Sequence, residues 1–303
     1  MLLTHEEVPP LLKRKHILEG YRPLNQPTFF YFLSAFRLHN ELLNVWTHFV
    51  PALFLLYFYM IPELTSEHPR TPVIVLHVAI LILLIGSSSA HLFHSKSPLN
   101  HVFWYLIDFS GIAIFGLAIG LQRFACCMNM GLVMNIAYVP LLMTVVLGMQ
   151  FFSSCYLFVH KPHWKWRLEL RMGSCFLLAC WLFIPLYARY YVESADQDSG
   201  LHLHTRAFQW LMISGIFMGA HIPERFAPGL FDIVGYGHQL FHLCINMVAW
   251  NLLDSADLDC DATESKFFSW KNITITVSFV GSIAFIMYTV RKLMQRAFNN
   301  KYD

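Results

Sequence analysis

Eight long apolar stretches divide the chain, and they constrain its fold more than any other feature of the sequence. They cover residues 44–61, 72–93, 101–121, 130–158, 169–189, 205–222, 235–253 and 273–290. Each is about as long as a helix must be to cross ~30 Å of hydrocarbon at ~1.5 Å per residue. Charged residues make up only 13% of the 303 residues, against about 25% in ordinary soluble domains. Because no ten-residue alternating pattern supports a barrel, the sequence predicts an all-α, polytopic membrane helical bundle.

The distribution of Lys and Arg predicts the orientation of this bundle. With a cytoplasmic N-terminus, fifteen of the 21 Lys and Arg residues lie on the cytoplasmic side, and the acidic run from Asp254 to Glu264 lies outside. We therefore expect a cytoplasmic basic and amphipathic segment at 1–43, a transmembrane domain at 44–290 and a basic cytoplasmic tail at 291–303. The formal net charge of +2 argues against a nucleic-acid partner, which would require a strong basic surplus.

Apolar and basic residues alternate in blocks along the N-terminal segment. Leucine and isoleucine residues flank the basic cluster Lys13–His16, and a Phe-rich stretch at 29–36 follows Pro27. Both stretches are suited to lie in the plane of the membrane interface, with basic residues toward anionic headgroups. The first stretch is equally compatible with a solvated basic loop.

Polar residues within the predicted spans lie at one depth. Ser87 and His91 end the second span, Asp108 lies early in the third, and His238 and His242 open the seventh. Spacing of four puts each pair on one helix face, and the topology places all five within ~10 Å of the cytoplasmic boundary. Since an ionisable group inside a span costs about 2.5–3.5 kcal/mol on insertion scales, each is expected to have a partner or a function.

Three neutral imidazoles with an open fourth position form the usual ligand set of a catalytic zinc ion. We therefore predict a Zn²⁺ site at His91, His238 and His242. Asp108 is the candidate catalytic residue that holds or deprotonates a metal-bound water, and Ser87 is the candidate that orients the ligand or substrate.

Two alternatives to this ligand set stay open on the sequence alone. A single histidine in a span is more often a hydrogen-bonded packing residue, and we interpret His48, His77, His101 and His221 in that way. His94 lies on nearly the same helix face as His91 and is an alternative ligand, while His221 is a spare ligand on the cytoplasmic side.

The motif HNELLNVWTH, residues 39–48, leads into the first span. Its Asn40 is placed to cap the start of the helix, and Glu41 is interpreted as a first-turn partner of the helix dipole rather than as a catalytic group. Glu224 and Arg225, in the turn-rich connection between the sixth and seventh spans, are candidates to fix that loop against neighbouring helix ends.

The seven cysteines predict little by themselves. Cys126, Cys127 and Cys260 lie on the predicted outer side, where a disulfide is allowed, but their spacing does not assign one. The other four lie within spans and are interpreted as small apolar packing residues: Cys155, Cys175, Cys180 and Cys244.

Three segments of the sequence together resemble the progestin and adipoQ receptor family. They are GYRP at 20–23 with HNELLNVWTH, then SSSAHLFHSKSPLNHVFWYLIDFSG at 87–111, and PERFAPGLFDIVGYGHQLFH at 223–242. The sequence is most similar to the membrane progestin receptor branch, and an eighth span fits that branch better than the seven-span adiponectin receptors. The resemblance implies a seven-helix core plus an eighth C-terminal span, with a cytoplasmic N-terminus and a zinc ion near the inner leaflet.

The resemblance also implies roles for individual residues. The zinc ligands of the family match His91, His238 and His242. Its water-holding aspartate matches Asp108, and its serine near the metal matches Ser87. All five residues are present in this chain.

Two functions are compatible with this resemblance. The progestin branch implies a plasma-membrane receptor for a steroid of the progestogen type, which signals through a G protein or another cytoplasmic effector. The wider group of membrane hydrolases to which the family belongs includes alkaline ceramidases, which implies a zinc-dependent amide hydrolase acting on ceramide-like lipids. A purely structural zinc site would instead favour four protein ligands and no polar group beside a bound water.

Overall fold

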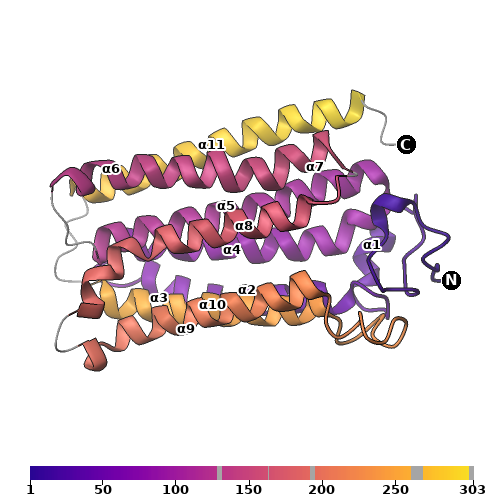
Figure 1. Ribbon diagram of the computed structural model, residues 1–303, viewed down its shortest axis with the longest axis horizontal. Helices are drawn as coiled ribbons and strands as arrows, with labels where there is room; N and C mark the ends of the chain where they lie inside the picture. The colour runs from indigo at the N-terminus through magenta and orange to yellow at the C-terminus, as the bar shows by residue number, and fades with distance from the viewer. Residues whose placement is uncertain (128–131, 163, 192–194, 261–268, 300–303) are drawn as a thin grey trace.

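The chain folds into a bundle of long helices that run roughly parallel or antiparallel to one another, as the computed structural model shows (Figure 1). The structure describes residues 1–303 except 128–131, 163, 192–194, 261–268 and 300–303. Within the described residues there is no strand, and the one β-bridge joins Leu3 to Tyr21. The N-terminal segment and the C-terminal end of the last helix lie at the same end of the bundle.

The helices follow the predicted spans closely. The α-helices longer than four residues are α1 (Thr28–Ser34), α2 (Leu42–Leu55), α4 (Thr71–Phe93), α5 (Pro98–Cys126), α6 (Leu132–Met143), α8 (Arg167–Leu182), α9 (Ser199–Ala220), α10 (Gly237–Asp259) and α11 (Trp270–Asn299). Shorter or wider helical segments continue or connect them: η1 (Pro10–Leu12), η2 (Leu56–Met60), α3 (Ile61–Leu64), η3 (His94–Lys96), η4 (Thr144–Tyr156), α7 (Leu157–His160), η5 (Ile184–Tyr191) and η6 (Ala195–Gln197).

Five of these helical segments are long and apolar enough to cross a membrane: Leu42–Leu64, Thr71–Lys96, Pro98–Cys126, Met134–His160 and Trp270–Asn299. A sixth forms if α8 and η5, which bend by 50°, make one broken span. The remaining two predicted spans correspond to α9 and α10, which have the required length but carry more polar residues. Some of those polar residues, such as His204, His238 and His242, belong to the clusters described below. Because α9 and α10 are not among the candidate membrane spans, the total of eight spans stays a prediction.

Two of the spans contain a proline followed by a π-helical segment. Pro51 lies inside α2 and precedes η2, and Pro140 lies inside α6 and precedes η4. Proline lacks the N–H of the helical ladder and its ring displaces the preceding carbonyl, so the following turns widen to recover hydrogen bonds. The predicted stretches 44–61 and 130–158 are therefore single spans built from several helical segments.

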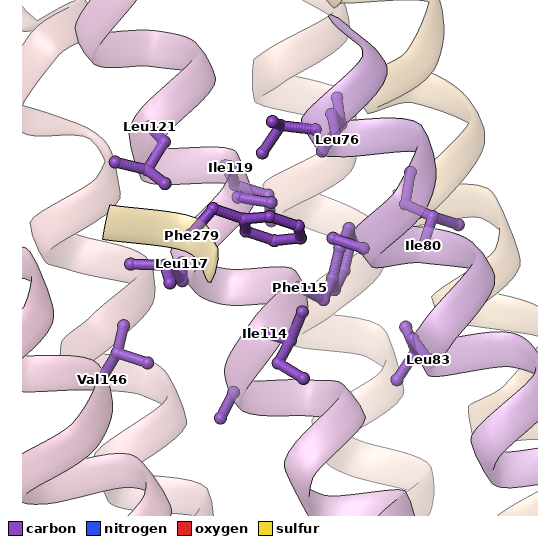
Figure 2. Close-up of a cluster of buried hydrophobic side chains, with 14 of the residues drawn as sticks. Leu76, Ile80, Leu83, Ile114, Phe115, Leu117, Ile119, Leu121, Val146 and Phe279 are labelled. Atoms are coloured by element: carbon purple, nitrogen blue, oxygen red, sulfur yellow. The ribbon is translucent and has the colours of Figure 1, made fainter. Parts of the chain in front are cut away.

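Helix α5 forms the centre of the bundle. Its apolar side chains pack against α4, η4 and α11, as Figure 2 shows for Ile114 and Leu117 together with Val146 and Phe279. In contrast, large apolar side chains on the outer face of α11 are exposed; Val277, for example, is 66% exposed. An exposed apolar surface of this kind suits contact with lipid rather than water.

A disulfide and a network of arginines join the helix ends at the end of the bundle far from the N-terminus. Cys126, the last residue of α5, is bonded to Cys260, which follows α10. The pairing resolves the choice among the three cysteines that the sequence left open, because Cys127 is a free thiol. The two cysteines are 134 residues apart in the sequence. Their disulfide fixes the C-terminal end of α10 to the C-terminal end of α5.

Candidate metal centre

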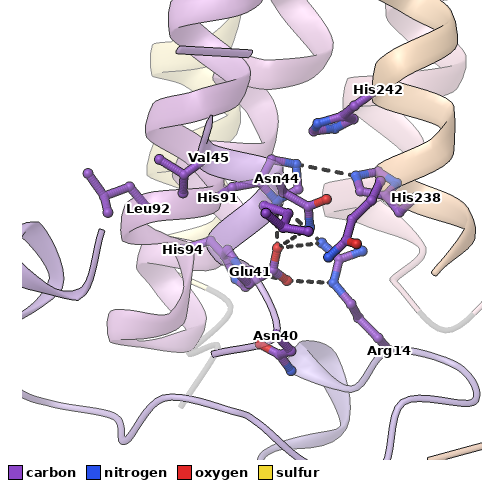
Figure 3. A network of polar contacts seen from close by, with 12 residues as sticks. Arg14, Asn40, Glu41, Asn44, Val45, His91, Leu92, His94, His238 and His242 are labelled. Carbon is purple, nitrogen blue, oxygen red and sulfur yellow. Dashed lines mark hydrogen bonds and ion pairs between the residues drawn. The ribbon is translucent and has the colours of Figure 1, made fainter. Parts of the chain in front are cut away.

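Three histidines from two helices that are far apart in the sequence lie close together at the N-terminal end of the bundle (Figure 3). His91 comes from the last turn of α4, and His238 and His242 come from the first two turns of α10. One ring nitrogen of each lies within 4.8 Å of one ring nitrogen of the others, and the Nε2 atoms of His91 and His238 are 3.2 Å apart. The three ring centroids are 4.7–5.0 Å apart. A single cation fits between imidazoles at this separation.

Hydrogen bonds behind two of the rings fix which nitrogen faces inward. The Nδ1 of His91 lies 2.7 Å from a carboxylate oxygen of Glu41, which accepts only, so this nitrogen carries the proton. Thr47 donates its hydroxyl to a backbone carbonyl at 2.7 Å and its oxygen accepts from Nδ1 of His242 at 3.0 Å. In both rings the lone pair is then on Nε2. This is the arrangement of metal-ligating histidines, in which a partner holds the other ring nitrogen.

Glu41 has a position behind His91 that the sequence pattern did not predict. It is the N-cap residue of α2, yet its side chain makes no capping hydrogen bond. Asn40 does not cap that helix, so the predicted Asn40 cap was wrong, whereas the position of Glu41 at the helix N-terminus remains compatible with an interaction with the helix dipole. The Glu41 carboxylate is buried behind His91 and also receives hydrogen bonds from Asn44 at 2.6 Å and from Arg14 at 2.5 and 3.1 Å.

This carboxylate stays ionised at neutral pH. Burial alone would raise the pKa of Glu41, but the Arg14 guanidinium and His91 hold that pKa well below its ordinary value. Burial would likewise lower the pKa of Arg14, whereas the facing carboxylate raises it well above the usual range. An ionised Glu41 increases the basicity of the His91 ring that it contacts.

Asp108 and Ser87 lie beside the three histidines. Asp108 is on α5 and Ser87 is on α4, one turn before His91. Both side chains are buried, and the Asp108 carboxyl has Ser87 and His91 as neighbours. All five residues singled out in the sequence therefore meet in one place.

The site opens onto a cavity of about 1080 Å³. Ser87, Asp108, His238 and His242 line its wall near the N-terminal end of the bundle, together with residues 10–15 and Ile17, and mostly apolar residues of α5, α8, α9 and α10 line much of the rest. The lining includes Ile119, eleven residues beyond Asp108 on α5, which corresponds to ~16 Å along a helix. A cavity of this size and largely apolar lining accommodates a ligand such as a steroid or a lipid chain.

The other histidines near the site have separate positions. His94 contacts the other oxygen of the Glu41 carboxylate: its Nε2 atom lies 3.3 Å from Oε1. The Nδ1 atom of His94 lies 3.1 Å from the Nδ1 atom of His101. His48 stacks face to face on His242, with ring centroids 3.8 Å apart. His221 ends α9 with a left-handed backbone conformation and lies at the cavity wall. Glu41, His91 and His94 together form a second group with the spacing of metal ligands.

The first turn of α10 is held close to the end of α9. Glu224 accepts a hydrogen bond from the backbone nitrogen of Gly237 at 2.6 Å, which fixes the loop as the sequence suggested for this residue. A Cβ atom at Gly237 would lie 2.7 Å from the carbonyl oxygen of Phe217 and 2.8 Å from that of Ile222. Only glycine permits this approach, which sets the position of the adjacent His238.

A third group of potential ligands lies at the opposite end of the bundle. Cys127, His204 and Asp259 have the spacing of metal ligands there. However, Arg123 donates to Nδ1 of His204 at 3.0 Å, so the proton of that ring is on Nε2, which lies 2.7 Å from the Asp259 carboxylate. Arg189 occupies the other oxygen of Asp259 at 2.9 Å. The guanidinium groups of these arginines supply the hydrogen bonds and positive charge that the group requires, so it connects helix ends and needs no metal ion.

The fold and site together define a multi-pass membrane protein with a buried three-histidine centre beside a large cavity. Residues 36–251 match the family described as Haemolysin-III related, and the chain belongs to this family. The human membrane progestin receptor alpha is 30% identical over 97% of this chain and 89% of its own length. The alpha receptor of Sus scrofa is 31% identical over 84% and 75%, and the gamma receptor of Mus musculus is 27% identical over 85% and 81%. These similarities confirm the family predicted from the sequence motifs.

Proposed function

We propose that this protein is a plasma-membrane receptor for a steroid of the progestogen type, with a zinc site at the cytoplasmic end of its ligand cavity. The observation that carries the proposal is the opening of the three-histidine centre onto the cavity of about 1080 Å³. The relatives named above are called membrane progestin receptors. A rigid apolar ligand loses little conformational entropy on binding and matches a mostly apolar wall.

Two observations support a cytoplasmic position for the histidines. The positive-inside distribution of Lys and Arg favours a cytoplasmic N-terminus, and the N-terminal segment lies at the histidine end of the bundle (Figure 1). The disulfide between Cys126 and Cys260 lies at the other end, and disulfides persist mainly in oxidising compartments. Coupling to a G protein or another cytoplasmic effector is part of this proposal.

The residues present fit a zinc ion. His91, His238 and His242 would hold it through Nε2, and no fourth protein ligand joins this group of three among the described residues. A zinc ion at such a site polarises a bound carbonyl and lowers the pKa of a bound water. Glu41 and Thr47 orient two of the rings from behind, so the inward lone pairs are directed before any metal binds.

A zinc-dependent lipid amide hydrolase of the ceramidase type is the second candidate function. The position of Asp108 between Ser87 and His91 favours it, because a buried carboxyl at an open zinc position can accept a proton. Ser87 is a neighbour of that carboxyl and would help to position it. Arg171 lies on the cavity wall with its guanidinium 4.5 Å from the ring centroid of Phe109 and could bind the carboxylate that amide hydrolysis releases.

Filling the cavity tests the receptor function. Gly215 lines the cavity, and its nearest neighbour for an added Cβ is a methionine methyl group at 3.8 Å. We expect Gly215→Phe to weaken binding of tritiated progesterone by at least about tenfold. The phenyl ring would occupy space in the cavity, and the lost contacts would reduce the binding free energy by ~1.4 kcal/mol or more. The measurement is saturation binding to membranes that contain equal amounts of each protein.

Gly281→Phe is the matched control. Gly281 is on α11, has open space around its Cβ position and lies outside the cavity lining. Its substitution should leave progesterone binding unchanged. Equal binding by wild type and Gly215→Phe would contradict the cavity as the steroid site, and an absence of saturable binding by the wild type would contradict a progesterone receptor.

A further inference from the structure

The N-terminal segment forms part of the cavity wall next to the histidines. Residues 10–15 and Ile17 line the cavity, although they lie 27–34 residues before the start of the first predicted span at residue 44. The segment is attached at its two ends: Val8 and Ile17 are buried in a small cluster with Tyr21 and Tyr236. Further along, the Asp232 carboxylate accepts hydrogen bonds from the backbone nitrogens that follow Ile17, at 3.0 and 2.7 Å.

Between these attachments, Arg14 reaches into the centre of the site. Its Nε and Nη2 atoms donate to the two oxygens of Glu41, and Nη2 also lies 3.1 Å from the hydroxyl of Tyr105 (Figure 3). The same Nη2 lies 3.4 Å from Nδ1 of His91. Arg14 and His91 thus share one carboxylate. The Oε2 atom of Glu41 accepts a hydrogen bond from Nδ1 of His91 and another from Nη2 of Arg14.

We propose that residues 10–17 are a lid over the cytoplasmic mouth of the cavity, and that the pair of Arg14 and Glu41 is its latch. With the latch closed, Arg14 acts as a positioning residue: it orients the carboxylate that in turn orients His91. With the latch open, the mouth of the cavity is accessible to molecules from the cytoplasm. The entry of a ligand and the affinity of the histidines for a metal are therefore coupled through one ion pair.

The ion pair of Arg14 and Glu41 keeps the lid closed unless its charges gain other partners. Breaking a buried ion pair leaves an uncompensated charge, which is strongly unfavourable unless water or a ligand reaches it. When the lid lifts, both Arg14 and the mouth of the cavity gain water, so opening is possible as a local event. An anionic headgroup or a carboxylate at the mouth would also offer Arg14 a replacement partner.

The test uses the full-length protein and two readouts. Cys175 lines the cavity, whereas Cys155 is buried outside that lining. Peptide mass spectrometry after a pulse of a small water-soluble maleimide measures the labelling rate of each cysteine separately. Zinc affinity is measured by competition with a chelator. The variants are Arg14→Met, Arg14→Lys, Glu41→Met and the combination of Arg14→Met with Glu41→Met.

We expect Arg14→Met to raise the labelling of Cys175 several-fold while Cys155 stays unlabelled, and to weaken zinc binding by about 10–100-fold, the usual loss when an outer partner of a ligand is removed. Arg14→Lys should show smaller changes in both readouts than Arg14→Met, because lysine retains the positive charge but cannot donate to both carboxylate oxygens as arginine does. In the Glu41→Met background, Arg14→Met should add little, since the two residues act on the same contact. Arg225→Met is the matched control: this exposed arginine lies outside the cavity lining and should change neither readout.

The coupling rests on the zinc site proposed above, but the lid does not. If Arg14→Met leaves the labelling of Cys175 unchanged, the lid is wrong, whatever the zinc result. If labelling rises but zinc affinity equals that of the wild type, the coupling is wrong. If the wild-type protein binds no zinc, the proposed metal site fails, and the labelling experiment still decides whether residues 10–17 close the cavity.

Discussion

Replacing Asp108 with Asn is expected to lower the hydrolysis of a fluorescent short-chain ceramide by at least about a hundredfold. Asn has nearly the same shape but cannot accept a proton, and general-base catalysis typically contributes a factor of 10²–10⁴. Progesterone binding should persist, because a neutral steroid exchanges no proton with the site. The measurement compares product formation and saturation binding on the same purified preparation, and it separates the two candidate functions.

A matched control exists at the other end of the bundle. Asp257 is paired with Arg70, and its side chain is 67% exposed. Asp257→Asn removes one carboxylate by the same chemical change and should alter neither activity. Ceramide hydrolysis that is equal in Asp108→Asn and wild type would remove the hydrolase function, and loss of steroid binding would show that Asp108 contributes to the ligand pocket itself.

Replacing His238 or His242 with Ala is expected to abolish stable zinc binding. Removing an outer partner of a metal ligand costs about 10–100-fold in affinity, so removal of one ligand of three should cost more. The two residues open α10 on the same face, and neither can replace the other because both are already directed at the same point. Zinc affinity from chelator competition measures the effect.

His77→Ala is the control for the loss of a buried histidine. His77 is on α4, like His91, but lies fourteen residues earlier, or ~21 Å along the helix. Its loss should leave zinc affinity unchanged. If His238→Ala retained wild-type affinity for zinc, the assignment of this histidine as a ligand would be contradicted.

The class of the fold could be predicted from the sequence because one physical requirement dominates it. An unpaired backbone is too costly in hydrocarbon, so every apolar run of sufficient length becomes a helix. Details within the spans follow from local chemistry that the pattern does not reveal. Pro51 and Pro140 widen their helices into π segments rather than ending them, because the turns that follow recover the hydrogen bonds.

The common depth of the three histidines could be inferred from the topology of the spans. Once the direction of each span is assigned, the ends of α4 and α10 that carry His91, His238 and His242 fall at the same depth. Sequence could not tell which helices are neighbours within the bundle. That adjacency depends on tertiary packing, in which α10 lies beside both α2 and α4.

The residues behind the histidines could not be found in this way. Glu41 precedes the first span, where an acidic residue has an ordinary explanation in the helix dipole. Its actual partner, Arg14, lies 27 residues earlier in a segment without regular spacing. The available signal was the burial cost of a carboxylate near the membrane, which requires a cationic or donor partner. The pairing of Cys126 with Cys260 likewise depends on which helix ends are adjacent.

Zinc K-edge X-ray absorption of the purified, full-length protein, together with its metal content, tests the central claim most directly. We expect about one zinc ion per chain with three imidazole nitrogens at about 2.0–2.1 Å, one further light-atom ligand and no sulfur ligand. The signal should disappear in His238→Ala. A metal-free wild-type protein, or a zinc ion coordinated by sulfur at about 2.3 Å, would contradict a centre built from His91, His238 and His242.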